Sequence, residues 1–385
     1  MARAGRKPSG AYARSAAMPR RHELARAVPR SLLCLSMLVL AGLGSGCSTV
    51  EYYWQGINGE IEILRKARPI EEVIATDADR ELREKLERVL AIRDFASRDL
   101  MLPDNGSYRR YTRLERRFVL WNVFAAPELS LRPRQWCFPV AGCVNYRGYF
   151  DEAEARAEAS RLASAGDDVS VGGVPAYSTL GYFDDPVLST FIRYPDAELA
   201  RLIFHELAHQ VAYAKDDSVF NESFAVAVEE EGVKRWLKAR KDPELEAQFA
   251  SSQRYREAFR LMVKSTRERL SALYASNASE EEKRAGKMAA FADMKAGYEA
   301  RKAEWGGFGP YDNWFARGPN NASLTAVGLY AQKVPQFRAL LAAMGNDLPA
   351  FYARVKDLSA MPRDQREAAL AAVSPAVAEA VRKED

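Results

Sequence analysis

The sequence predicts a mainly α-helical protein with a small β section, an α+β fold. Apolar residues recur at helical spacing over most of the chain after its N-terminal segment. A middle section, residues 135–188, is richer in Gly, Pro and β-branched residues, which favours short strands and turns. A strongly apolar helix starting near residue 196 carries a compact group of polar side chains. This third feature indicates where the chemistry of the protein lies.

Helices account for most of the expected elements. Two of them, 243–275 and 279–305, are long, charged and separated by a short connection, which favours an antiparallel pair. Further short helices are expected after Gly318. In the middle section, 168–171 and 176–180 are expected as strands around a Gly172-Gly173 turn. The remaining expected helices cover residues 52–67, 69–98, 110–126, 151–165 and 219–240.

The segment His205-Glu206-Leu207-Ala208-His209 has the pattern H-E-x-x-H and contains two of the three histidines of the chain. Residues four apart lie on one face of an α-helix, so both imidazoles can point at one ion. The flanking residues are apolar around most of the helix, which is typical of an interior helix. Buried polar groups need partners, and a divalent cation supplies them. The pattern indicates a zinc peptidase, with two histidine ligands and Glu206 as base; a surface helix with two unrelated histidines is the alternative.

The third metal ligand is expected to be a carboxylate. Catalytic zinc usually has three protein ligands and one water. The remaining histidine, His22, lies in the N-terminal segment, and no cysteine follows the motif. Glu222 follows His209 after twelve residues and Glu229 after nineteen, both on the next expected helix. They stand about two turns apart, too far to share an ion, and spacing alone leaves either open.

Several runs resemble a family of bacterial lipoproteins described as predicted aminopeptidases, which are H-E-x-x-H zinc peptidases with a glutamate ligand. They are spread over nearly the whole chain after the N-terminal segment. The runs are Tyr52-Tyr53 with Gln55, Trp136-Cys137-Phe138-Pro139-Val140-Ala141-Gly142-Cys143, Tyr146-Arg147-Gly148-Tyr149-Phe150, Ala176-Tyr177-Ser178-Thr179-Leu180-Gly181, Phe204 to Gln210, Phe220-Asn221-Glu222-Ser223-Phe224-Ala225 and Asn320-Asn321-Ala322.

The resemblance implies a zincin-like fold in which the motif helix packs on the helix that bears Glu222. It favours Glu222 as third ligand, because Asn221-Glu222 and the following Phe-Ala resemble the third-ligand helix of glutamate zincins. Glu229 then supports the ligands or lies in the cleft, or belongs to an acidic run on a solvated face. We expect one domain over 47–385, with or without a helical subregion at 243–305.

The implied activity is zinc-dependent hydrolysis of peptide bonds, by an aminopeptidase that acts on periplasmic peptides. Zinc would polarise the scissile carbonyl and lower the pKa of water, while Glu206 deprotonates that water and later protonates the leaving amine. The motif defines the chemistry and leaves the substrate open. An endopeptidase, a cell-wall peptide amidase or a non-catalytic metal-binding lipoprotein are the alternatives.

The N-terminus has the layout of a secretory signal of the lipoprotein type, over residues 1–46. Arginines precede an apolar run, 32–43, which is too short to span a membrane. Gly44-Ser45-Gly46 then leads to Cys47, the expected site of cleavage and lipidation. Ser48 follows where an aspartate would favour the inner membrane, so we expect a periplasmic protein anchored in the outer membrane. A plain signal peptide, with Cys47 as a mature thiol, is the alternative.

The cysteines and the net charge agree with this expected localisation. Cys137 and Cys143 are the pair that remains in the mature chain, close enough to form a local disulfide in an oxidising periplasm or else to stay reduced. The net charge is +4, and much of it comes from the arginine-rich leader. No nucleic-acid partner is therefore expected.

Substrate contacts are expected from four polar side chains and one strand. Segment 176–180 would be an edge strand that pairs with the extended substrate, as edge strands do in zincins, or an ordinary hairpin strand. Asn320 and Asn321 suit recognition of substrate amides, although Asn pairs also make turns and caps. Tyr177 and Tyr330 are candidate donors to the oxyanion.

An aminopeptidase also needs a carboxylate that binds the free amine of its substrate. The G-A-M-E-N run that supplies it in aminopeptidase-N-like enzymes is absent from this sequence. Asp184, Asp185 and Glu229 are the candidates to replace it. Acetylation of the substrate N-terminus should then block cleavage.

Overall fold

The computed structural model describes the backbone of residues 52–138, 142–328 and 332–384, and side chains as far as residue 373. Residues 52–385 form one compact unit. The signal segment 1–46, Cys47 and Tyr330 lie outside the described residues.

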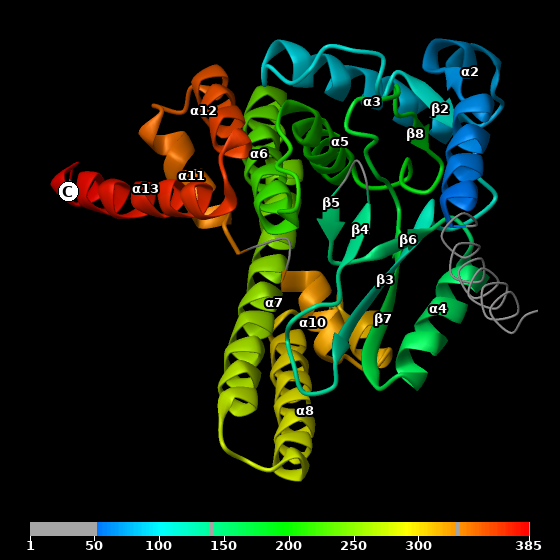
Figure 1. Cartoon of the computed structure of the whole chain (residues 1–385). Helices are drawn as coiled ribbons and strands as arrows, with labels where there is room; N and C mark the ends of the chain where they lie inside the picture. The colour runs from blue at the N-terminus through cyan, green and yellow to red at the C-terminus, as the bar shows by residue number, and fades with distance from the viewer. Residues whose placement is uncertain (1–51, 139–141, 329–331, 385) are drawn as a thin grey trace, which may run out of the picture. The chain divides into compact units, whose positions relative to one another are not determined.

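Helices make up most of the described chain, as expected (Figure 1). None of the described helices combines the length and the apolar character that crossing a membrane requires. Residues 52–66 form the first helix. The others are α2 (Ile70–Thr76), α3 (Arg80–Arg98), α4 (Glu152–Ser164), α5 (Asp196–Val211), α6 (Ser218–Arg240), α7 (Pro243–Ala275), α8 (Glu280–Glu304), α9 (Asp312–Ala316), α10 (Asn321–Gly328), α11 (Val334–Ala343), α12 (Leu348–Ala360) and α13 (Arg363–Glu384).

The strands form three small sheets. One has the order β6-β3-β7 and is antiparallel throughout, one has the order β1-β2-β8, and one is the hairpin β4-β5. The strands are β1 (Arg68–Pro69), β2 (Arg110–Thr112), β3 (Leu120–Pro127), β4 (Trp136–Phe138), β5 (Gly142–Val144), β6 (Arg147–Tyr149), β7 (Asp167–Val174) and β8 (Val187–Leu188).

The helix expected over 110–126 is wrong, because this segment contains β2 and the central strand β3. β3 is buried along nearly its whole length. Its Trp121 and Val123 pack with α4 residues, whereas Phe124, on the other face, packs with Ala322 of α10. A strand covered on both faces shows no alternation of polar and apolar residues, so its apolar run fits a helix as well as a strand.

The edge strand before the metal motif is β7 rather than 176–180. Residues 176–179 have no regular structure, and Gly172-Gly173 lies inside β7 instead of forming a turn. β7 is an edge strand because it pairs with β3 on one side only. Asn320 Nδ2 donates to the Val169 carbonyl on the other side, at 2.9 Å. The backbone N–H and C=O groups of successive residues in a strand face opposite edges. Val171 and Gly173, two and four residues after Val169, therefore direct their backbone groups to the same free edge.

Helix α5 packs closely against α6, as the resemblance implied. Phe204 on α5 is fully buried and meets α6 at Gly232. A Cβ at Gly232 would lie 2.8 Å from Phe204 Cδ2 and 2.9 Å from Leu100 Cδ1. Glycine is unfavourable inside a helix, so its presence here marks a place where two elements approach too closely for a side chain.

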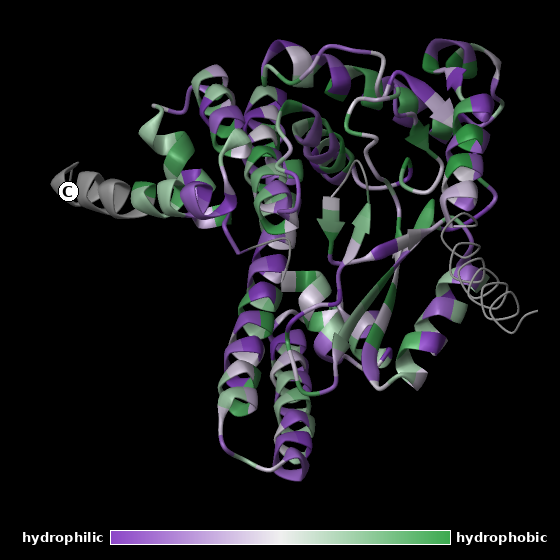
Figure 2. Ribbon diagram, in the orientation of Figure 1, coloured by the Kyte–Doolittle hydropathy of each residue, from purple (hydrophilic) through white to green (hydrophobic). Residues whose placement is uncertain are grey.

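The pair α7 and α8 is antiparallel and has its own apolar seam, as the sequence indicated (Figure 1). Figure 2 shows hydrophobic residues (green) interspersed with hydrophilic ones (purple) along both helices. The seam includes Phe259, Met294 and Tyr298, and it is shared with Leu324 of α10. This pair is thereby joined to the sheet region through α10.

Cys137 and Cys143, expected as a pair, form a disulfide across the β4-β5 hairpin. The backbone N–H of Cys143 donates to Asp216 Oδ1 at 2.5 Å, in the connection between α5 and α6. The disulfide hairpin is therefore attached to the loop that joins the two site helices.

Replacing Gly232 with Ala tests the close approach of α5 and α6. The new Cβ must displace Phe204 or Leu100, and overpacking of this kind costs about 1–3 kcal/mol, partly offset by the better helix propensity of Ala. We expect a net loss of roughly 1–2 kcal/mol in the free energy of unfolding, measured by urea titration. Gly297→Ala on α8 is the matched control, because a Cβ there has no atom within 4 Å. That variant should gain up to about 1 kcal/mol, and a Gly232→Ala variant as stable as the wild type would contradict the packing described.

Candidate metal centre

Helix α5 presents His205 and His209 on one buried face. Their exposed fractions are 9% and 8%, and their rings meet edge to face with centroids 4.9 Å apart. Leu202, Ile203 and Leu207 on the same helix are buried in the main core, which holds α5 in place. The one-turn spacing predicted from the motif is therefore realised in an interior helix.

Helix α6 brings Glu222 to the same point. Its carboxylate oxygens lie 3.3 Å from His205 Nε2 and 3.8 Å from His209 Nε2. One ligand atom from each of the three residues can be chosen so that all lie within 4.8 Å of one another. The structure thus brings together the three residues expected as ligands.

The connection between α5 and α6 is held by buried polar contacts that position Glu222. Asn221 accepts a hydrogen bond from the Ala214 N–H at 2.7 Å and donates to the Ala214 carbonyl at 2.8 Å. Asp217 caps α6 by accepting from the Phe220 N–H, and it also pairs with buried Arg366 of α13 at 2.9 Å. An Asn directly before the ligand therefore orients the start of its helix.

Glu229, two turns further along α6, supports His205 and is not solvated. It is 5% exposed, and its Oε2 lies 2.8 Å from His205 Nδ1 and 2.9 Å from Arg201 Nη1. Arg201 also donates to Glu198 at 2.8 Å. Because its carboxylate is already bound to an arginine and a histidine, Glu229 is a poor site for a substrate amine. The solvated-face interpretation of this residue is wrong.

The protonation of the site follows from this crowding of acids. Burial alone would lower the pKa of His205, but the hydrogen bonds to Glu222 and Glu229 raise it to about 10. Burial lowers the pKa of His209 to about 4. Despite burial, Arg201 and His205 lower the pKa of Glu229 to about 2. The acids around His205 therefore favour a positive charge between them.

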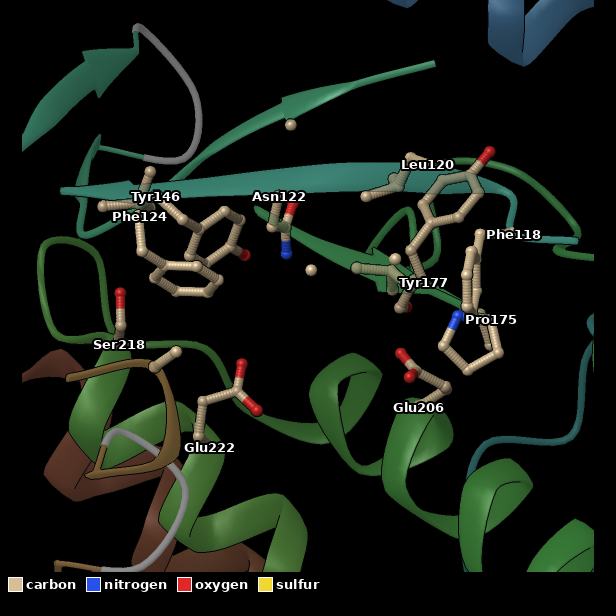
Figure 3. Close-up of a pocket in the computed structure, with 18 of the residues that line it drawn as sticks. Phe118, Leu120, Asn122, Phe124, Tyr146, Pro175, Tyr177, Glu206, Ser218 and Glu222 are labelled. Carbon is tan, nitrogen blue, oxygen red and sulfur yellow. The ribbon is translucent and has the colours of Figure 1, made fainter. Parts of the chain in front are cut away.

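Glu206 differs from the other acids because its carboxylate points into open space. Burial raises its pKa to about 7, against the lowering effect of His205. Figure 3 shows the Glu206 carboxylate directed into the cavity, near Pro175. A carboxylate with a pKa near neutrality and access to a cavity suits proton transfer.

The cavity around these residues is large, about 1650 Å³. It is lined by the three candidate ligands, Glu206 and residues 169–174 of β7. In Figure 3, Phe124 and Tyr146 lie at the Glu222 end, and Pro175 and Tyr177 lie at the Glu206 end. Its walls are mainly aromatic and aliphatic, which is typical of a site that excludes water from a bound ligand.

The side chains of the two asparagines expected to contact substrate form hydrogen bonds within the protein. Asn321 is fully buried, and its amide donates to the carbonyl of Glu128 at 2.8 Å. Asn320 donates to Val169 of β7 and accepts from the Ser323 N–H at the start of α10. Neither residue lines the cavity. Their amides attach α10 to the sheet, so the capping alternative is the one that fits.

The two aspartates expected as candidates for amine binding lie outside the lining of the cavity. Asp185 is buried and accepts from the backbone and hydroxyl of Thr179 at 3.1 and 2.7 Å. Asp184 is exposed, and neither aspartate lines the cavity. Asp185 organises the irregular segment that was expected to be a strand.

Tyr177 does line the cavity, but its hydroxyl donates to Glu60 of the helix over residues 52–66. This bond directs its hydroxyl to that helix, which does not favour a role as oxyanion donor. Glu60 itself was missed from the sequence. It belongs to no motif, and it stands far from residue 205 along the chain, so no local signal could indicate its place in the cavity wall.

Two imidazoles and one carboxylate thus meet in a cavity that is also lined by a further acid, Glu206. The chain belongs to the family described as Putative aminopeptidase, whose model matches residues 51–370. No curated protein matches this chain. No solved structure matches it either.

A Glu229→Gln substitution tests the support given to His205 and Arg201. Removing this charge leaves the half-buried Arg201 with only Glu198, so we expect the free energy of unfolding to fall by roughly 1–3 kcal/mol. Glu231→Gln is the control, because Glu231 pairs with Arg235 one turn away on the same helix, where such pairs contribute about 0.3–0.5 kcal/mol. Equal urea midpoints for the two variants would show that the Glu229 contacts stabilise the fold no more than the Glu231 pair on the helix surface does.

Proposed function

We propose that this protein is a zinc-dependent peptidase with a glutamate ligand, and that it removes residues from the N-terminus of peptides. The observation that carries the proposal is the convergence of His205, His209 and Glu222 beside the free carboxylate of Glu206. Membership of the family described as Putative aminopeptidase supports the peptidase class.

The residues present fit a zinc ion. Two imidazole nitrogens and a carboxylate oxygen are the ligand types that catalytic zinc takes, with room left for a water. Glu222 Oε2 is buried and His209 Nδ1 is buried without a hydrogen-bond partner in the described chain. Glu229 holds His205 by its other ring nitrogen, as carboxylates commonly do for histidine ligands. Zinc, when bound, would polarise a carbonyl and lower the pKa of water.

Glu206 carries the proton transfers in this proposal. Its pKa near 7 allows it to accept a proton from the attacking water and to return it to the leaving amine at neutral pH. The apolar walls of the cavity strengthen these electrostatic effects by excluding water.

The free edge of β7 would bind the substrate backbone. Val171 and Gly173 turn backbone donors and acceptors to this edge, and none of the described residues bonds to them there. An extended peptide can add to the edge as a further strand. β7 thus takes the role that the sequence suggested for 176–180, and the zincin-like fold remains part of this proposal.

The cellular address rests on the sequence. We propose cleavage before Cys47, lipidation of that cysteine and outer-membrane attachment facing the periplasm. The disulfide between Cys137 and Cys143 supports an oxidising compartment.

Glu206→Gln and His209→Ala separate the two roles in the site. The glutamine variant should keep one zinc per chain and lose at least about 10³-fold in turnover, because the base is gone and the ligands remain. The alanine variant should lose both zinc and activity. Zinc is measured by mass spectrometry of the metal, and activity with a panel of short peptides with free N-termini.

The control is a wild-type sample stripped by a chelator and then supplied with zinc, which should recover its activity. Full turnover by a zinc-loaded Glu206→Gln variant would rule out the base assignment. Undiminished zinc in His209→Ala would rule out the ligand assignment.

A further inference from the structure

A carboxylate in the cavity wall has no role in the chemistry described so far. Glu60 comes from the helix over residues 52–66, yet it lines the same cavity as the metal-ligand cluster. One of its oxygens accepts the Tyr177 hydroxyl, and the other, Oε1, is buried without a hydrogen-bond partner. In the described part of the chain it forms no ion pair. The residue is therefore a sheltered acid with one neutral donor.

The other acids of the cavity are already accounted for. Glu222 and Glu229 contact the two histidines, and Glu229 and Glu230 are paired with arginines. Glu206 is the proposed base. Glu60 is the remaining acid among the described residues that line the cavity, and it has neither a cationic partner among them nor a proposed catalytic role.

Burial raises the pKa of Glu60, against the effect of the Tyr177 hydroxyl, which shows that its charge is poorly compensated. Arg116, the cation near Tyr177, contacts Glu62 at 3.4 Å rather than Glu60. An ammonium group has three N–H donors and a full positive charge. It could therefore donate a hydrogen bond to Oε1 and at the same time compensate the negative charge of the carboxylate.

The direction of β7 would place the amine of a bound peptide at the end of the cavity where Tyr177 and Glu60 lie. β7 runs from Asp167 to Val174 and continues through Pro175 to Tyr177, the partner of Glu60. A peptide that adds antiparallel to β7 runs the opposite way, so its N-terminus points toward Tyr177. In Figure 3, Pro175 and Tyr177 lie at the end of the cavity where Glu206 is found.

We propose that Glu60 binds the free α-ammonium group of the peptide substrate and so selects peptides with an unmodified N-terminus. This inference rests on the proposed peptidase function. Glu60 is a specificity residue in this account, and Tyr177 positions its carboxylate.

The first test compares a peptide with a free N-terminus and its N-acetylated form, using the zinc-loaded wild type, Glu60→Gln and Glu62→Gln. The wild type should cleave the free peptide at least tenfold better, measured as kcat/KM. Glu60→Gln should lose this preference, mainly through a KM at least tenfold higher for the free peptide. Glu62→Gln, an isosteric change on the same helix outside the cavity, should behave as the wild type.

The second test measures binding without turnover, by calorimetry of the same two peptides with Glu206→Gln and with Glu60→Gln/Glu206→Gln. The single variant should bind the free peptide at least tenfold more tightly than the acetylated one, and the double variant should bind both equally weakly. Because this readout needs no cleavage, it remains informative if the protein is not a peptidase.

The possible results separate the two proposals. A wild type that holds zinc and cleaves both peptides equally would overturn the role of Glu60 and leave the peptidase proposal standing. A preference for the free amine that survives Glu60→Gln would also overturn the role of Glu60. The same holds if the only effect of Glu60→Gln is a lower unfolding temperature. Absence of zinc and of any cleavage in the wild type would instead overturn the proposed function.

Discussion

The site depends on the close contact between α5 and α6. His205 and His209 come from one helix and Glu222 from the other, so the distance between the two axes decides whether three ligand atoms can meet. Gly232 permits that distance by leaving space for Phe204, and Asn221 fixes the connection at the other end of the interface. Small changes in this packing would move a ligand by more than a metal site tolerates, because ligand distances vary by only about 0.2 Å.

A second constraint is the balance of charge inside this interface. Burying several carboxylates beside two histidines is costly unless cations compensate them. Arg201 compensates Glu198 and Glu229 from one side, and His205 stands between Glu229 and Glu222. Glu206 lies outside this network, and its carboxylate faces the cavity. The same reasoning distinguishes Glu60, which is half-buried and forms no ion pair with any described residue.

The parts of the fold that the sequence predicted well are those with strong local patterns. Helix α5 has a strongly apolar sequence and begins at the expected residue. The pair α7 and α8 has spaced apolar residues and capping residues at its starts, and the observed bounds lie close to the expected ones. β3 has no alternating pattern because both of its faces are covered, and the sequence does not distinguish capping from ligand binding at Asn320 and Asn321 because both use the same side chain. Glu60 could not be found at all, since its place in the cavity depends on tertiary packing.

The central claim is that His205, His209 and Glu222 hold a zinc ion in the interface between α5 and α6. X-ray absorption at the zinc edge of the purified protein tests it most directly. The account predicts one zinc per chain with two imidazole nitrogens and carboxylate or water oxygens at about 2.0–2.2 Å. A shell that contains sulfur at about 2.3 Å, a shell with fewer than two imidazoles, or a protein that retains no zinc would contradict it.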